Sequence, residues 1–163
     1  MIIRPATPDD AHQIVALLQD VVDKGGTTAF QGQVPADFLA PVLAGSDPRG
    51  ICHVAEEGDL LLGFQYIFPL QGGPADRAPI ATFARLGSTQ RGIGAALFGA
   101  TRQAAIGFGY RTIDATIRAD NSGGLRYYGR MGFADHHVTR DVPLANGTPV
   151  DRVTKLLALG DGA

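Results

Sequence analysis

The chain has 163 residues, of which 45% are hydrophobic and 18% charged. This length is typical of one domain, and the composition is that of a globular rather than a disordered protein. The 14 Lys and Arg and the 16 Asp and Glu give a net charge of -2, and no block of like charges would attract nucleic acid or anionic lipid. No apolar run reaches the roughly 18 residues that a membrane span requires. We therefore expect one domain over residues 1–163 with no nucleic-acid or membrane partner.

The single cysteine and the start of the chain bear on the compartment. Cys52 has no second cysteine with which to form an internal disulfide, and residues 1–5 lack the apolar core of a signal sequence. We therefore expect a cytoplasmic protein. Cys52 lies in an apolar stretch, which favours packing over nucleophilic chemistry. His136 and His137 are adjacent and would face opposite sides of a strand, so we expect no metal site.

The first third of the chain predicts a short strand at 2–4 and two helices. Thr7, followed by Pro8 and Asp10, is typical of a helix start, and Gly25 with Gly26 ends that helix. Between them, apolar residues recur at helical spacing: Ala11, Ile14, Val15, Leu18 and Val22. A shorter helical pattern runs over 34–42, with Pro41 limiting its regularity.

The remaining residues predict six strands and two helices. Strand formers separated by turn residues predict strands at 51–56, 60–68, 78–86, 111–117, 138–142 and 150–159. Helical spacing predicts helices at 93–108 and 121–131. The first two of these strands form a hairpin, and the last two form another around Asn146-Gly147. This order of elements predicts a mixed α/β protein with a partly antiparallel sheet.

A glycine-containing turn over residues 90–97 joins a predicted strand to a predicted helix. The first N–H groups of such a helix have no partner within it, and the helix dipole adds partial positive charge there. Gly92 and Gly94 lack side chains that would hold a phosphate away, and Arg91 can add a charged contact. These features predict a diphosphate site, while glycines that merely turn the chain remain the alternative.

Two familiar phosphate motifs fit this turn poorly. In a nucleoside-triphosphate loop, Lys and Ser or Thr would stand where Ile93 and Gly94 are found. In a dinucleotide fingerprint, Gly or Ala would replace Leu97, and the acidic residue would end the next strand, whereas Asp114 is in mid-strand. A nucleotide-binding domain of dehydrogenase type is therefore a distant alternative.

A second pattern follows the turn: Asn121, Gly124, Tyr128 and then Gly132-Phe133. Together with residues 90–97, this pattern resembles the GNAT superfamily of N-acetyltransferases, over nearly the whole chain. The resemblance implies a GNAT-like mixed (α+β) fold. Its central sheet would have about seven mostly antiparallel strands and about four flanking helices, and would be splayed in the middle to admit coenzyme A.

The resemblance implies acetyl-CoA as cosubstrate and no metal. The glycine turn would hold its pyrophosphate, although Thr89 stands where the family places Arg or Gln, and Gln90 is the nearest substitute. Gly124 would leave a gap for the pantetheine arm, and amides near 84–86 would pair with that arm and polarise the carbonyl. The residues implied to contact the cofactor are Ala84, Leu86, Gln90, Arg91, Gly92, Ile93, Gly94, Ala95, Asn121 and Gly124.

Tyr128 is the residue that the resemblance implies as general acid. It shares a helix face with Asn121 and Gly124, whereas Tyr127 points about 100 degrees away and would pack or line the substrate side. A tyrosine pKa of about 10 lies above the thiol value near 8.5, so the phenol can donate as charge develops on sulfur. A buried tyrosine that anchors the helix is the alternative.

The base that deprotonates the amine is poorly marked. Family members often carry a Glu on the strand before the glycine turn, but residues 78–86 contain no carboxylate. Asp114 is our candidate base, with Glu56, His53 and a water relay as alternatives.

The segment at 25–33 would shape the acceptor pocket, and we expect Thr27, Thr28 and Phe30 to contact the acceptor. Arg85 could pair with an acceptor carboxylate. The hypothesis is an N-acetyltransferase that acts on the primary amine of a small molecule, with an amino-acid-like molecule as one candidate. The runner-up is a coenzyme A-binding sensor of the same fold without turnover, and a homodimer is left open.

Overall fold

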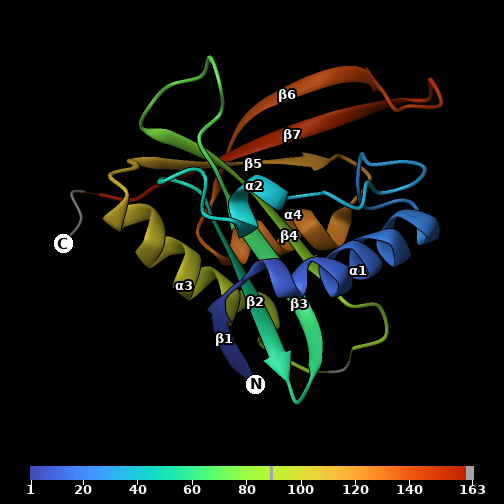
Figure 1. The fold of residues 1–163 in the computed structure, drawn as a ribbon. Coiled ribbons are helices and arrows are strands. Elements are labelled where there is room, and N and C mark those ends of the chain that lie inside the picture. Colours follow the sequence, from blue (N-terminus) through green and yellow to red (C-terminus); the bar gives the residue numbers. More distant parts are fainter. Residues whose placement is uncertain (89, 161–163) are drawn as a thin grey trace.

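The computed structural model describes residues 1–88 and 90–160 and follows the predicted order of elements. In chain order these are β1 (Ile2–Pro5), η1 (Pro8–Asp10), α1 (Ala11–Lys24), α2 (Ala40–Leu43), β2 (Ile51–Glu57), β3 (Leu60–Ile67), β4 (Arg77–Ala84), α3 (Ile93–Gly107), β5 (Thr112–Arg118), α4 (Ser122–Arg130), β6 (Ala134–Pro143) and β7 (Pro149–Ala158) (Figure 1). Among these described residues, no helix is long and apolar enough to cross a membrane.

The strands form one 7-stranded sheet in the order β1-β2-β3-β4-β5-β7-β6. Every neighbouring pair is antiparallel except β4 and β5. The parallel pairing is short, because residues 77–79 of β4 pair with 112–114 of β5 and the strands then separate. The predicted mixed, splayed sheet is confirmed. It is not the parallel, doubly wound sheet of a dehydrogenase, so that distant alternative is wrong.

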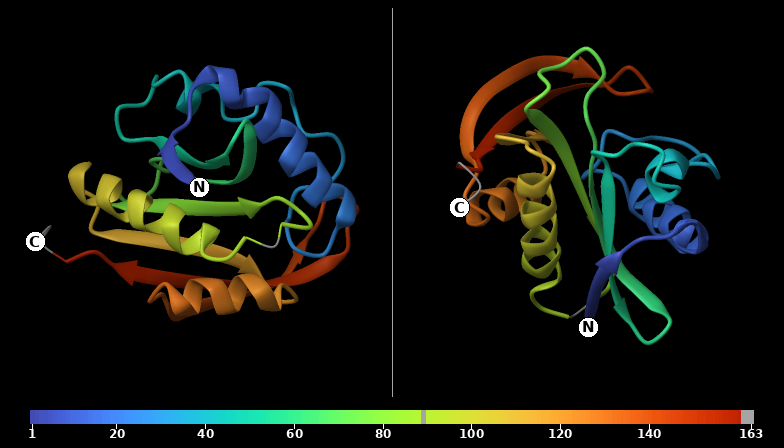
Figure 2. Two further views of the ribbon diagram at one scale, coloured as in Figure 1. Left: turned by 90° about the horizontal axis from the view of Figure 1, so that it is seen from below. Right: turned by 60° about the vertical axis from the view of Figure 1, so that its left-hand side comes forward.

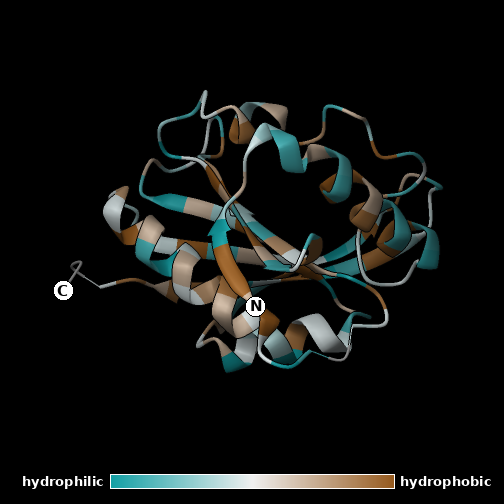
Figure 3. Ribbon diagram, turned by 60° about the horizontal axis from the view of Figure 1, so that its bottom comes forward, coloured by the Kyte–Doolittle hydropathy of each residue, from teal (hydrophilic) through white to brown (hydrophobic). Residues whose placement is uncertain are grey.

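Helices cover both faces of the sheet, with α1 and α2 on one side and α3 and α4 on the other (Figure 2). The apolar stripe of α1 packs on Phe64 and Tyr66 in one core cluster. On the opposite face, Phe98 of α3 and Tyr128 of α4 pack with Ile113 in a second cluster. Figure 3 shows hydrophobic residues concentrated along the central strands. Side chains that alternate along the central strands therefore belong to one helix layer or the other.

The start of α1 is held by a small polar cluster. The backbone N–H of Thr7 donates to Asp10 Oδ2 at 2.8 Å, and the Arg4 guanidinium donates to both oxygens of Asp10 at 2.9 Å. Arg4 also donates to Glu56 Oε2 at 2.7 Å, which ties β1 to β2. The hydrogen bond from Arg4 lowers the pKa of Asp10. Gly25, with φ 74°, ends α1 as predicted.

The second helix is shorter than the sequence pattern predicts. Turns occupy 36–39, and α2 contains four residues. Leu39 adopts a left-handed φ of 61°, which interrupts the helix just before Pro41. The strand predicted at 78–86 is β4 and ends at Ala84, and β6 begins at Ala134, earlier than the predicted 138.

Candidate functional site

The separation of β4 and β5 opens a cleft of about 520 Å³ through the middle of the sheet. It is lined from the α3–α4 layer by Thr82, Tyr127 and Tyr128, and from the α1–α2 layer by Phe83 and the α1–α2 loop. Of the predicted site residues, it brings together Thr27, Thr28, Phe30, Ala84, Leu86, Gly94, Asn121, Gly124 and Tyr128.

The edge of β4 that faces the cleft carries backbone groups with no strand beside them. The Arg85 N–H donates to Leu62 O at 2.8 Å, so alternate residues of β4 pair with β3. The residues in between, including Thr82 and Ala84, therefore direct their N–H and C=O groups toward the cleft. The backbone of Ala84, one of the predicted cofactor contacts, therefore faces the cleft.

Arg85 does not lie in the cleft, contrary to the acceptor role considered for it. Its Nε donates to Leu61 O at 2.7 Å, which holds the side chain against β3. It is absent from the residues that line the cleft. Odd-numbered residues here face the α1–α2 layer, and the hydrogen bond to Leu61 then turns this side chain away from β5.

The N-terminus of α3 reaches the cleft at Gly94. Gly92 has φ 82° and precedes the helix, and the Ala96 N–H makes the first helical bond, to Gly92 O at 2.9 Å. The amides of Ile93, Gly94 and Ala95 therefore lie in the first turn, ahead of any acceptor within the helix. Gln90 and Arg91 are exposed just before it, and Thr89 lies outside the described residues.

Gly94 and Gly124 each lie against a neighbouring side chain that an added Cβ would strike. A Cβ on Gly94 would lie 2.5 Å from Cε1 of Tyr127, so this glycine makes room for an aromatic ring. A Cβ on Gly124 would lie 2.6 Å from Nδ2 of Asn121. Asn121 Oδ1 accepts from the Gly124 N–H at 3.0 Å and caps α4, and both residues line the cleft.

A buried hydrogen-bond network connects the two tyrosines to β3 and β4. Gln65 Nε2 donates to Thr82 Oγ1 at 2.8 Å and to the Tyr127 hydroxyl at 3.0 Å. The Tyr127 hydroxyl donates to Gly94 O at 2.7 Å. Thr82 Oγ1 and the Tyr128 hydroxyl are 2.8 Å apart. The rings of Tyr127 and Tyr128 touch edge to face, with centroids 4.9 Å apart.

Burial keeps both phenols protonated. Desolvation raises the pKa of Tyr128 well above its ordinary value of 10, against the opposing hydrogen bond from Thr82. Burial also raises the pKa of Tyr127. We therefore expect Tyr128 to hold its proton below about pH 10.

No candidate base lies in the cleft. Asp114 stands opposite Pro79 where β4 and β5 are still paired, and burial raises its pKa while Arg77 opposes the rise. Glu56 is held by Arg4, and burial lowers the pKa of His53 in β2, which keeps that imidazole neutral. Among the described residues, the lining of the cleft contains no Asp, Glu or His.

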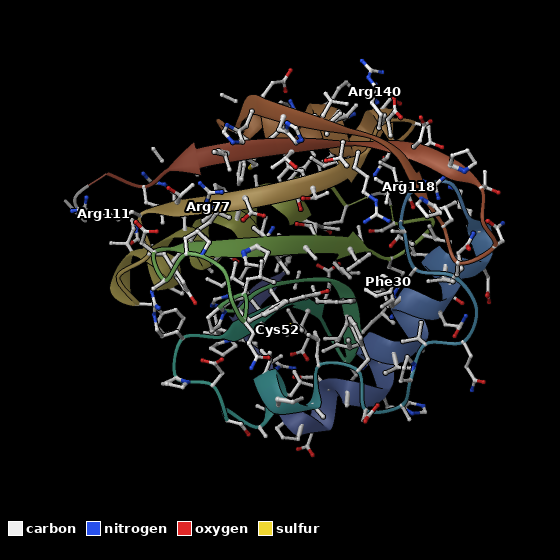
Figure 4. The ribbon with its side chains drawn as sticks, turned by 90° about the horizontal axis from the view of Figure 1, so that it is seen from above. Phe30, Cys52, Arg77, Arg111, Arg118 and Arg140 are labelled. Carbon is white, nitrogen blue, oxygen red and sulfur yellow. The ribbon has the colours of Figure 1, made fainter. Side chains whose placement is uncertain are left out.

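The α1–α2 loop is held across the cleft by a side chain of β5 and one at the start of α4. Arg118 Nη1 donates to Thr28 O at 3.0 Å, and Asn121 Nδ2 donates to Thr27 O at 3.1 Å. Phe30, on the same loop, contacts the Phe83 ring with a centroid separation of 6.4 Å. Figure 4 shows Arg118 and Phe30 at the same end of the sheet. The loop residues predicted for acceptor binding therefore form one wall of the cleft.

Two cleft arginines and one buried glutamine were not predicted. Arg118 and Arg152 are opposite each other in β5 and β7, and both line the cleft. Gln65 is completely buried and its Oε1 has no hydrogen-bond partner among the described residues. A polar residue in the middle of an apolar strand is the signal that would have marked Gln65.

Residues considered for other chemistry have ordinary positions. Cys52 is buried, and burial raises the pKa of its thiol to about 12, so it packs as a core residue. His136 and His137 are exposed on β6. Across residues 1–88 and 90–160, no group of three or more His, Cys, Asp and Glu is placed to hold a metal.

One comparison with known proteins shows a family, and another shows a shared fold. A model of the acetyltransferase (GNAT) family matches residues 21–133. The structure of an N-acetyltransferase from Staphylococcus aureus Mu50 superposes with a TM-score of 0.86 at 21% identity, covering 97% of this chain and 98% of that one. Ribosomal-protein-alanine N-acetyltransferase from Brucella melitensis gives 0.86 at 18%, covering 97% and 99%.

A third solved structure, yncA from Salmonella typhimurium, contains its cofactor acetyl-CoA. It gives a TM-score of 0.86 at 19% identity, covering 98% of this chain and 94% of that one. A search of curated proteins found no match. At these identities the superpositions establish a shared fold.

Proposed function

Because the chain belongs to the GNAT acetyltransferase family, we propose that it transfers the acetyl group of acetyl-CoA to the primary amine of a small molecule by direct attack. One observation carries this proposal. The cleft combines a protonated, buried Tyr128, the unpaired edge of β4 and the start of α3 in one continuous space.

The residues present suit a diphosphate-bearing thioester carrier. The first-turn amides of α3, from Ile93 to Ala95, would hold the pyrophosphate, with Gln90 and Arg91 beside it. Backbone groups of Thr82 and Ala84 would pair with the amide groups of an extended pantetheine arm, as one strand pairs with another. When bound, acetyl-CoA supplies an activated acyl carbonyl. The presence of acetyl-CoA in the similarly folded yncA supports this assignment.

The network around Tyr128 favours one direction for its proton. Gln65 uses both amide hydrogens, one on Thr82 and one on Tyr127. Thr82 accepts that hydrogen and can give its own to the Tyr128 oxygen. The Tyr128 proton is then left to face the cleft, where it can be donated to the departing thiolate.

The acceptor amine must lose its proton without help from a cleft side chain. An alkyl ammonium with a pKa near 10.4 is neutral in only about one molecule in 2,500 at pH 7. Because no Asp, Glu or His lines the described cleft, we propose that solvent takes the proton. Asp114, at the closed end of the β4–β5 junction, would act only through such water.

This arrangement predicts a pH profile that follows the acceptor. We expect kcat/KM to rise about tenfold per pH unit up to the pKa of the acceptor amine itself. The raised pKa of Tyr128 keeps the acid protonated, so no falling limb is expected below about pH 10. Profiles for two accepted amines of different pKa would check this. A shared inflection near neutrality for both amines would reveal a protein base and contradict the prediction.

The fold alone does not select the acceptor. Solved structures named for phosphinothricin and for ribosomal-protein alanine superpose on this chain with TM-scores of 0.84 and 0.86. A cleft of about 520 Å³, with its loop fastened by Arg118 and Asn121, favours a small molecule.

The absence of a carboxylate or histidine from the described cleft favours the alternative of a coenzyme A-binding sensor without turnover. Calorimetry with acetyl-CoA, followed by an amine panel monitored for thiol release and acetylated product, separates the two. Heat of binding with sustained release that requires an amine supports the enzyme. Binding without release supports the sensor, and the absence of binding at millimolar acetyl-CoA would overturn both.

A further inference from the structure

Two arginines stand side by side in the cleft, near the α1–α2 loop. Arg118 of β5 is the register partner of Arg152 of β7, and both line the cleft. Opposed residues of an antiparallel pair project from the same face of the sheet. Because Ile113 and Ile117 belong to the α3–α4 core, the alternation places both arginines on the α1–α2 side, away from Tyr128.

Arg118 is already neutralised. Its Nε and Nη2 donate to the two carboxylate oxygens of Asp120 at 3.0 and 2.8 Å, and its Nη1 donates to Thr28 O. All three of its nitrogens therefore have partners. The role of Arg118 is to hold the α1–α2 loop, and its charge is balanced by Asp120.

Arg152 differs from Arg118 in lacking a partner. Its Nε is buried and makes no hydrogen bond within the described structure, and its guanidinium forms none of the ion pairs found there. No acidic residue lines the described cleft to balance it. The guanidinium of Arg152 thus has no counter-charge in the described cleft, and its buried Nε–H has no acceptor. Leaving such groups unpaired costs free energy unless a ligand pairs with them.

A simple amine cannot complete this site, because an ammonium ion would meet a like charge. A carboxylate matches it: it carries one negative charge, and its two oxygens fit the planar fork of a guanidinium. We propose that Arg152 binds the carboxylate of an amino-carboxylate acceptor, whose amine then extends through the sheet toward Tyr128. This inference rests on the proposed acetyl transfer, and it moves the acceptor contact considered for Arg85 to a different strand.

The test uses pairs of acceptors that differ only in the carboxylate. Glycine, β-alanine, 4-aminobutyrate and leucine are each compared with their carboxamides by kcat/KM. We expect the wild-type protein to favour at least one carboxylate over its carboxamide by about tenfold or more, and Arg152→Gln to abolish that preference. Arg140→Gln is the matched control, since Arg140 lies on β6 with its side chain 77% exposed (Figure 4). Equal use of carboxylates and carboxamides by the wild-type protein would overturn the proposal.

A binding measurement separates this proposal from the enzymatic one. The Nε–Hε NMR resonance of Arg152, identified by its loss in Arg152→Gln, is followed while the same probes are added in the presence of coenzyme A. A saturable shift with a carboxylate but not with its carboxamide supports the site, and no shift with any carboxylate contradicts it. A carboxylate-specific shift without acetylation would refute the acetyl transfer and support the carboxylate site at Arg152. Acetylation without that shift would support the acetyl transfer and refute the carboxylate site.

Discussion

Replacing Tyr128 by Phe is expected to lower kcat by about 100-fold or more while changing the Kd of coenzyme A little. The substitution keeps the ring that packs against Phe133, with centroids 5.2 Å apart, and removes the hydroxyl next to Thr82. Without that hydroxyl, the thiolate must leave without a proton donor. Steady-state thiol release and calorimetry with coenzyme A measure the two quantities separately.

Tyr127→Phe is the matched control for this change. It also deletes one phenol from the network, but this hydroxyl donates to the backbone at Gly94 and accepts from Gln65. We expect it to reduce stability by about 1 kcal/mol and to reduce kcat far less than Tyr128→Phe does. Equal losses from both variants would show that the network matters as a scaffold, and an unchanged kcat in Tyr128→Phe would remove its role as an acid.

Gly94→Ala is expected to produce the second large effect. The added methyl would lie 2.5 Å from Cε1 and 3.1 Å from Cζ of Tyr127, so the ring or the start of α3 must move. Such overpacking costs about 1–3 kcal/mol of stability. It also disturbs the amides proposed to hold the pyrophosphate, so we expect the Kd of coenzyme A to rise by tenfold or more. Thermal unfolding and calorimetry provide the two measurements.

Gly99→Ala is the control in the same helix. A Cβ at Gly99 meets nothing within 4 Å, and glycine in a helix interior is less favourable than alanine by roughly 0.5–1 kcal/mol. We therefore expect this variant to be slightly more stable and to bind coenzyme A normally. If Gly94→Ala behaved like Gly99→Ala, the close approach of Gly94 to Tyr127 would matter neither for stability nor for coenzyme A binding.

The elements and the motif positions were predictable because they depend on local patterns. The helical spacing before Gly25, the strand–turn–helix at 78–108 and the spacing of Asn121 and Tyr128 can each be read without knowing the tertiary fold. The helix predicted over 34–42 was too long, because Leu39 adopts a left-handed φ of 61° that its local pattern does not reveal.

The polar network and the arginines were not predictable for the opposite reason. Gln65 meets Thr82 because β3 pairs with β4, and Arg152 meets Arg118 because β7 inserts between β5 and β6. Neither pairing is encoded in the spacing of residues along one strand. The same limit explains Gly94, whose neighbour Tyr127 is 33 residues away in sequence.

Because β4 and β5 pair over a short length only, unpaired backbone groups that are normal for an edge strand occur in the middle of this sheet. Beyond residue 79, β4 has unpaired peptide groups although it is the fourth of the sheet's strands. On an outer strand, such groups invite pairing with another chain and aggregation. Here they face a cleft of about 520 Å³ inside the sheet instead of an outer edge, and this is where the proposed cofactor would pair with them.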